Sequence, residues 1–217
     1  MNEGKPAGKS GCKIAFIVIL VIVGLFVALI AAGGIFVWQN KEQMGSQAVE
    51  FVLTATLEQA KFPAAEREAV MQPIRDLAAR VQAGEISMEQ VAKISMALTQ
   101  GPTFAALVIR GIEFSDLGEV DLSGEEAEKA RVTLSRFNYG LLQGEIGKEA
   151  LDPVLAILSL NPESRKSGNV HVELTAEKMR SCLDIMKTAA DAAQIEDRRM
   201  EVDLAAAIQQ TIDRELP

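Results

Sequence analysis

The chain has 217 residues and a formal net charge of −8. Residues 1–13 carry three lysines against one glutamate, a balance of +2, so residues 14–217 carry −10. A part that acidic, without a basic stripe, excludes nucleic acid as a partner, because binding phosphates needs clustered Lys and Arg. Aromatic residues make up only 5%, and long β-branched runs are confined to the first forty residues, which favours an all-α fold.

Residues 14–38 form an apolar run, IAFIVILVIVGLFVALIAAGGIFVW, without one charged side chain. Because the hydrocarbon core of a bilayer requires about 20 apolar residues in a helix, this run predicts a single transmembrane helix. Three lysines precede the run, whereas Lys41 is the only Lys or Arg after it before Lys61. The positive-inside bias therefore predicts that residues 1–13 are a basic cytoplasmic tail and that the rest of the chain is extracytoplasmic.

A cleaved secretory signal peptide is the alternative for this run, with the small residues Ala31–Gly34 near the cut. The run is about twice as long as the usual apolar region of about 7–15 residues in a signal peptide, which favours a retained anchor. Gly24, Ala28 and Ala32 recur every fourth residue on one helical face, a spacing that lets two membrane helices approach closely. We therefore regard these three as candidates for transmembrane association. Residues 39–61 follow as a juxtamembrane helical segment.

Two segments sixty residues apart, 62–98 and 122–158, have similar sequences. Aligned without a gap they share seven identities, among them the triplets Gly84-Glu85-Ile86 and Gly144-Glu145-Ile146, and their apolar stripes fall in phase. Each segment predicts a long helix, a turn at the glycine and a shorter helix whose start the isoleucine stabilises. The sequence thus predicts a bundle of repeated helical hairpins, with two copies in residues 62–160.

Caps and apolar stripes locate the expected helices and their core. Ser87 and Thr175 precede apolar-periodic segments as N-caps, and Cys182 lies on an apolar stripe, which predicts a buried free thiol. Pro73 and Pro153 fall inside stripes and predict kinks, although Pro153 could instead delay the start of its helix. The predicted core consists of Val70, Ile74, Leu77, Val81, Val91, Ile94, Leu98, Leu134, Phe137, Leu141, Leu155 and Leu158.

The C-terminal part begins after a polar stretch without periodicity, residues 161–173, which we interpret as a linker. Residues 174–217 are expected to form a helical segment, either a third, degenerate hairpin or one continuous helix. Near its end an apolar stripe repeats every fourth residue, narrow enough to be typical of a helix that meets one partner helix. The stripe is a candidate partner-docking surface, and the alternative is that it closes the bundle of its own chain. Its residues are Met200, Leu204, Ile208 and Ile212.

No motif in the sequence indicates a catalytic or metal site. His171 is the only histidine, which excludes pairs of histidine ligands, and no serine lies in a G-x-S-x-G sequence. The glycines of residues 4–10 are one residue too close for a phosphate-binding loop. Acidic clusters at residues 125–128 and 196–203 fit a helix's first turn and a solvated helix face. The sequence therefore predicts no catalytic residue, no metal and no cofactor.

These features favour a membrane-anchored extracytoplasmic helical interaction or scaffold module that is not an enzyme. Its expected partners are the lipid bilayer, through one helix, and another envelope protein or a second copy of itself. The alternative is an extracytoplasmic enzyme or ligand-binding helical bundle with an unrecognised site. A deep pocket with converging carboxylates would favour the alternative, and an exposed apolar patch would favour the interaction module.

Overall fold

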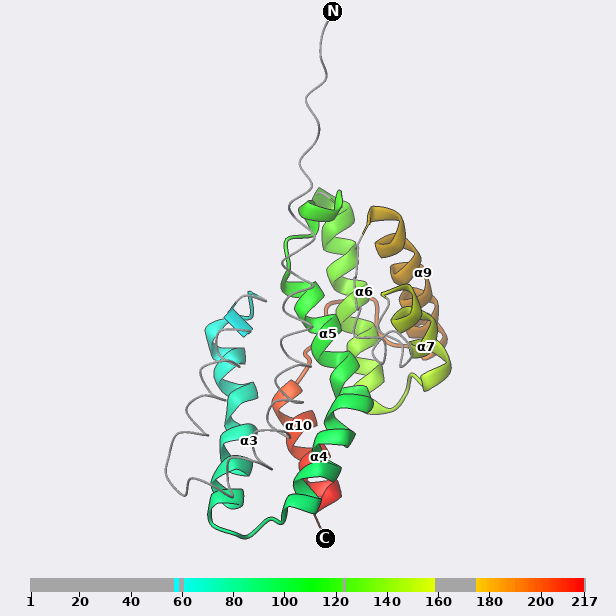
Figure 1. Cartoon of the computed structure of the whole chain (residues 1–217). Helices are drawn as coiled ribbons and strands as arrows, with labels where there is room; N and C mark the ends of the chain where they lie inside the picture. The colour runs from blue at the N-terminus through cyan, green and yellow to red at the C-terminus, as the bar shows by residue number, and fades with distance from the viewer. Residues whose placement is uncertain (1–56, 59–60, 123, 159–174, 217) are drawn as a thin grey trace, which may run out of the picture.

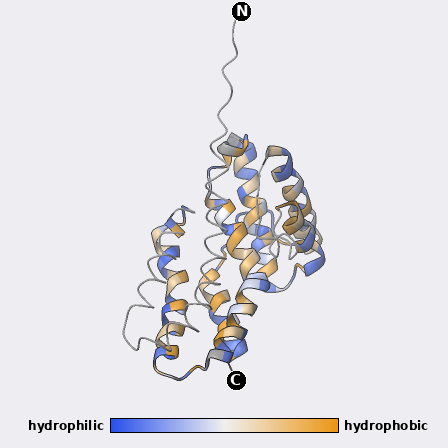
Figure 2. Cartoon of the chain, viewed as in Figure 1, coloured by the Kyte–Doolittle hydropathy of each residue, from blue (hydrophilic) through white to orange (hydrophobic). Residues whose placement is uncertain are grey.

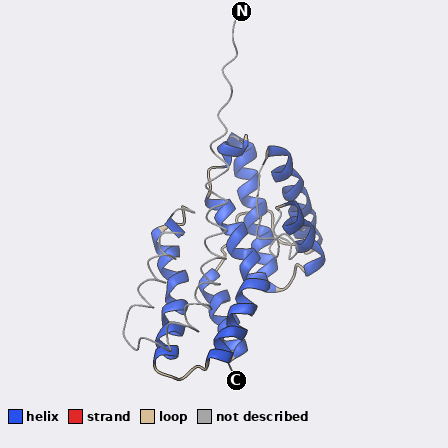
Figure 3. Cartoon of the chain, viewed as in Figure 1, coloured by secondary structure: helices blue, strands red, loops and turns tan. Residues whose placement is uncertain are grey.

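The computed structural model describes residues 57–58, 61–122, 124–158 and 175–216, and this part of the chain is all-α, as predicted (Figure 3). It contains seven α-helices and one 3-10 helix, with no strand among the described residues. The elements are α3 (Ala64–Gln82), α4 (Met88–Gln100), α5 (Pro102–Phe114), η1 (Leu117–Val120), α6 (Gly124–Gln143), α7 (Lys148–Ile157), α9 (Ala176–Ala192) and α10 (Leu204–Glu215).

The proposed membrane helix, residues 14–38, lies outside the described residues. The same holds for the candidate association residues Gly24, Ala28 and Ala32 and for the linker at residues 161–173. Among the helices that the structure does describe, none combines the length and the apolar character needed to cross a bilayer. The transmembrane helix stays a prediction from sequence.

The two hairpin segments end their first helices in the same way. Gly84 and Gly144 both have left-handed backbones, with φ of 73° and 74°. The amide after each glycine donates to the carbonyl oxygen four residues before that glycine, at 3.0 Å in the first hairpin and 2.9 Å in the second. This bond satisfies a carbonyl that the helix end would otherwise leave free, and glycine adopts the required φ without a steric cost. The isoleucine of each triplet is buried.

In each of the two similar segments, both helices contact the same C-terminal helix. α3 and α4 both contact α10, whereas α6 and α7 both contact α9. Figure 1 shows α7 and α9 on one side of the long α5–α6 pair, with α3 and α10 on the other. A connector, residues 193–203, carries the chain from α9, which contacts α6 and α7, to α10, which contacts α3 and α4. The C-terminal segment is therefore two separate helices, which excludes one continuous helix.

α5 is the helix that the apolar stripes did not indicate. Its sequence, PTFAALVIRGIEF, is apolar almost all the way round, and Thr103 to Ile109 are all buried. A helix of this kind has no polar face because neighbours cover most of its circumference, and α5 indeed contacts α4, α6 and α10. Helices at the outside of the bundle, such as α3, instead alternate between hydrophilic and hydrophobic residues (Figure 2).

The predicted core is mostly confirmed. Leu134, Phe137 and Ile94 are fully buried, and most of the other predicted residues are also buried. Four are only partly buried: Leu77, Val81, Val91 and Leu155.

The predicted N-caps are confirmed, and the predicted delay of a helix start at Pro153 is not. Ser87 is the N-cap of α4: its hydroxyl accepts from the amide of Gln90, whose side chain accepts from the amide of Ser87 at 2.8 Å. Thr175 caps α9 in the same manner. Pro153 lies inside α7, which begins at Lys148, so the suggested later helix start is wrong. Pro153 lies beyond the first turn, so it removes the helix hydrogen bond that an amide at this position would donate to the carbonyl of Glu149.

Candidate functional site: a groove between α4, α5 and α10

The apolar stripe of α10, predicted from sequence as a docking surface, lies in the interior. Leu204, Ile208 and Ile212 are at most 2% exposed, and Met200 packs against the same core. α10 contacts α3, α4 and α5 of its own chain, so it has several partner helices rather than one. The stripe closes its own bundle, which was the alternative interpretation. Leu204, Ile208 and Ile212 therefore present almost no surface to a partner, and the half-buried Met200 lies on the connector before α10.

A first polar cluster fastens the connector to α6. Arg136 of α6 is only 2% exposed. Its guanidinium donates to Asp191 at 2.8 Å, to Asp197 at 3.1 Å and to the carbonyl oxygen of Ile195. Hydrogen bonds from Lys187 and from Arg136 lower the pKa of Asp191. The buried cation is thus paired with carboxylates that stay in contact with water.

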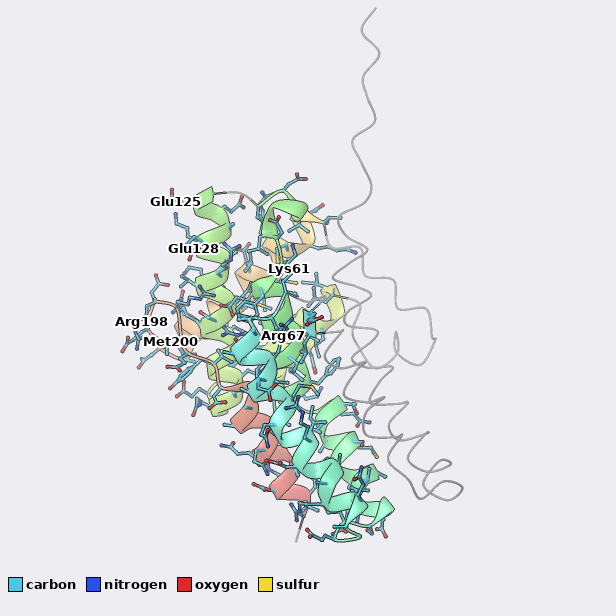
Figure 4. The ribbon with its side chains drawn as sticks, turned by 90° about the vertical axis from the view of Figure 1, so that its left-hand side faces the viewer. Lys61, Arg67, Glu125, Glu128, Arg198 and Met200 are labelled. Atoms are coloured by element: carbon cyan, nitrogen blue, oxygen red, sulfur yellow. The ribbon has the colours of Figure 1, made fainter. Side chains whose placement is uncertain are left out.

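Backbone groups of the connector are held as well. The hydroxyl of Ser135, the residue before Arg136, accepts the N–H of Met200 at 3.1 Å. Figure 4 shows Arg198 and Met200 side by side on the connector next to α6. Arg198 is exposed and pairs with Glu196, also exposed. The connector therefore turns a polar side to solvent while its backbone is bonded to the bundle.

A second cluster ties the connector to α5 and α3. The carboxylate of Glu113 is wholly buried and accepts from Arg110 at 2.6 Å and from Arg199 of the connector at 2.8 Å. Arg110 also donates to Glu66 of α3 at 2.7 Å and lies over the ring of Phe114 at 4.4 Å. Burial alone would lower the pKa of Arg110, but the bonds to both glutamates raise it above its ordinary value.

Both clusters hold parts of the chain together. In each cluster arginine side chains are paired with carboxylates of the same chain, so their charges are largely neutralised and little charge is left to act on a substrate. The acidic cluster at residues 125–128 is also paired, with Glu125 on Lys129 at 2.7 Å and Glu126 on Arg180 at 2.6 Å. Figure 4 shows Glu125 and Glu128 along the exposed start of α6. In the ranges that the structure describes, no His, Cys, Asp or Glu residues gather to hold a metal.

Apart from these ion-paired clusters, the described structure has an open groove of about 320 Å³ between α4, α5 and α10. Half-buried apolar side chains line it, namely Ala97, Leu142 and Ala207. At its bottom the hydroxyls of Thr103 and Thr211 lie 2.9 Å apart, both in buried residues. Because Thr211 donates to the carbonyl of Ala207 at 2.8 Å, Thr103 is the donor between the two hydroxyls. Thr103 thus keeps acceptor capacity facing the groove.

The rim of the groove carries exposed side chains without partners in the described structure. Met96 is 56% exposed and is the one large hydrophobic side chain exposed in these residues. Gln100 and Gln210 are exposed and form no side-chain hydrogen bond within the described ranges. Arg214 is also exposed, and it is the one described arginine without an ion pair.

Sequence reasoning did not find this groove. A signal existed at Met96, which lies off the apolar stripe formed by Val91, Ile94 and Leu98 and so falls on the polar face of its helix. No comparable signal marks Arg214, since nothing in the local sequence says which charged residues are paired.

The groove carries no recognised motif, so its role has to be inferred from the chemistry of its lining. Comparisons of the chain with protein families, with curated proteins and with solved structures found no match.

Proposed function

We propose that this chain is a membrane-anchored extracytoplasmic helical module that binds another protein and catalyses no reaction. The observation that carries the proposal is the groove, an open and partly apolar hollow flanked by the exposed Met96 and the unpaired Arg214. The exposed thioether of Met96 and the unused donors of Arg214 offer an apolar and a charged contact to another protein. The buried side chains of Glu113 and Arg136 support the part of the proposal that excludes catalysis, because both are bonded to groups of the connector.

The location of the module rests on the sequence. Residues 14–38 have the length and composition of a membrane anchor, and the lysines before them favour a cytoplasmic N-terminus. The remaining charge of −10 keeps the domain soluble and away from anionic lipid. We therefore place the domain in the envelope, tethered next to the membrane, where its partner is another envelope protein.

Chemical crosslinking of the tagged full chain in its native membranes tests the interaction. We expect a protein adduct of one defined mass that still forms when the membranes are washed at high salt before the crosslinker is added, because apolar contact contributes to binding. The matched control is a chain in which only the domain, residues 62–217, is replaced by an unrelated soluble domain. Equal adducts from both chains would mean that the anchor alone is recognised, and the proposal would fail.

Topology is tested separately with protease added to intact cells or spheroplasts. We expect a C-terminal tag to be lost and an N-terminal tag to be protected, since the positive-inside bias places residues 1–13 in the cytoplasm. A cytoplasmic marker protein serves as the control for membrane integrity. Protection of the C-terminal tag with the marker intact would contradict the proposed orientation.

A further inference from the structure

We infer that the groove binds a segment of a partner protein that carries an aliphatic side chain next to an aspartate or glutamate. The inference rests on the proposed function, because it names the chemistry of the partner that the interaction module takes. Three properties of the groove lead to it: its apolar walls, its hydrogen-bonding groups and its charge.

The apolar walls require an apolar side chain from the partner. Ala97, Leu142 and Ala207 are half-buried, so each still exposes apolar surface to the hollow. Small alanines on two facing helices, α4 and α10, leave the space into which a partner side chain fits. Met96 stands at the edge, and its unbranched thioether adjusts to the shape of whatever enters. An aliphatic side chain held under Met96 would remove apolar area from water on both molecules.

The charge of the rim requires a carboxylate. The domain is strongly acidic, and every other arginine that the structure describes pairs with a carboxylate of the chain. Arg214 therefore stands out as a guanidinium with its donors unused, next to an apolar hollow. Guanidinium binds carboxylate through two parallel hydrogen bonds, which fixes orientation as well as charge.

The remaining polar groups fit an extended or helix-end backbone beside that carboxylate. The amides of Gln100 and Gln210 offer both donors and acceptors at the rim, and neither is used within the described structure. Thr103 offers an acceptor at the bottom of the groove, since its proton is given to Thr211. A partner backbone N–H or C=O can bond to these groups, whereas a purely apolar lipid chain would leave them unsatisfied.

Site-specific photocrosslinking in the full chain tests the inference. The substitution Met96→p-benzoylphenylalanine, irradiated in native membranes, should attach to a different protein. Mapping of the adduct by mass spectrometry should place the attachment within one helical turn of an Asp or Glu. Adding Arg214→Glu should lower the adduct yield by about threefold to tenfold, because an exposed ion pair becomes a repulsion. Changing the mapped acid of the partner to Arg should restore the yield.

Lys129→Glu is the matched control for Arg214→Glu. It makes the same change in net charge at an exposed residue near the start of α6, and it should leave the adduct yield unchanged. Both variants should keep the melting temperature of the parent chain, since both positions are exposed. An adduct to a second copy, to residues 1–56 of the same chain or to lipid would overturn the inference. So would a yield that Arg214→Glu leaves unaltered.

The two proposals fail in different ways. If the chemical crosslinking of the tagged full chain captures a partner to which the benzoylphenylalanine at position 96 does not attach, the partner binds elsewhere on the domain. The groove inference is then wrong and the interaction module stands. If neither method captures a protein different from this chain, both proposals are wrong.

Discussion

At the scale of single residues, the interior shows two ways of burying charge. Glu113 is a carboxylate with no contact to water, bonded to two arginines. Arg136 is the converse, a buried cation whose carboxylate partners are 44% and 79% exposed. Removing Glu113 leaves the partly buried Arg110 with Glu66 as its one carboxylate partner in the cluster, whereas Arg199 is half exposed and can be solvated.

We therefore expect Glu113→Ala to lower the free energy of unfolding by about 3 kcal/mol, measured by denaturant unfolding of the full chain in detergent. Arg199→Ala should cost less than about 1 kcal/mol, because Glu113 keeps its bond to Arg110 and the lost pair is partly screened by water. Equal costs for the two substitutions would contradict this account of the cluster.

Cys182 provides a test of burial that depends on pH. Burial raises the pKa of its thiol from 9.0 to about 11, so the folded chain holds its proton more tightly than the unfolded chain does. This contribution to stability is fully present below pH 9 and is lost as the pH rises from about 9 to about 11. In a Cys12→Ser background, we expect iodoacetamide at pH 8 to label Cys182 only after denaturation. Rapid labelling of the folded chain would place the thiol at the surface.

At the scale of elements, glycine acts in two different ways. Gly84 and Gly144 are needed for their positive φ, and a Cβ at either position would meet nothing within 4 Å. Gly140, inside α6, is needed for space: a Cβ there would lie 2.3 Å from Cδ1 of Ile195 and 2.8 Å from Cδ1 of Ile146. The connector and the second hairpin turn thus approach α6 closely at this point.

Gly140→Ala and Gly111→Ala should have opposite effects on stability. The first forces Ile146 and Ile195 out of a packed site, at a cost of about 1–3 kcal/mol. The second adds a Cβ at ordinary contact, 3.7 Å from a ring carbon of Phe62, and should gain up to about 1 kcal/mol from helix propensity. Thermal melts of both variants provide the measurement. A stabilised Gly140→Ala would mean that the connector does not pack as described.

At the scale of the whole molecule, α10 joins parts of the chain that are distant in sequence. It contacts α3, α4 and α5, and the connector before it is bonded to α6. The C-terminal helix therefore closes the bundle. A chain without it would leave the apolar faces of α3 and α4 uncovered.

The double substitution Leu204→Asp and Ile208→Asp should abolish the cooperative melt, because it places two unpaired carboxylates in a core where these residues are at most 2% exposed. Met96→Asp, which also introduces a carboxylate at an apolar residue, should leave the melting temperature within about 2 °C because its side chain is 56% exposed. A normal melt of the double variant would mean that Leu204 and Ile208 are exposed. The stripe would then again be a candidate docking site.

Local sequence patterns predicted the all-α class, the caps at Ser87 and Thr175, and the two glycine turns. These features are local, since a helix end is satisfied by hydrogen bonds to groups three to five residues away. Most of the core followed for the same reason, because one face of a helix is visible as a period of 3.6 residues. α5 was missed because a helix buried on nearly every side shows no such period.

The way in which these elements combine depends on contacts between residues that are far apart in the sequence. Arg136 and Asp191 are 55 residues apart in sequence, and Thr103 and Thr211 are 108 apart, yet both pairs are bonded. No local pattern distinguishes an apolar stripe that meets helices of its own chain from one that meets a partner, as α10 shows. Nor does it distinguish the unpaired Arg214 from arginines that are paired. Such contacts depend on which distant surfaces bury the most apolar area together, and that competition involves the whole chain at once.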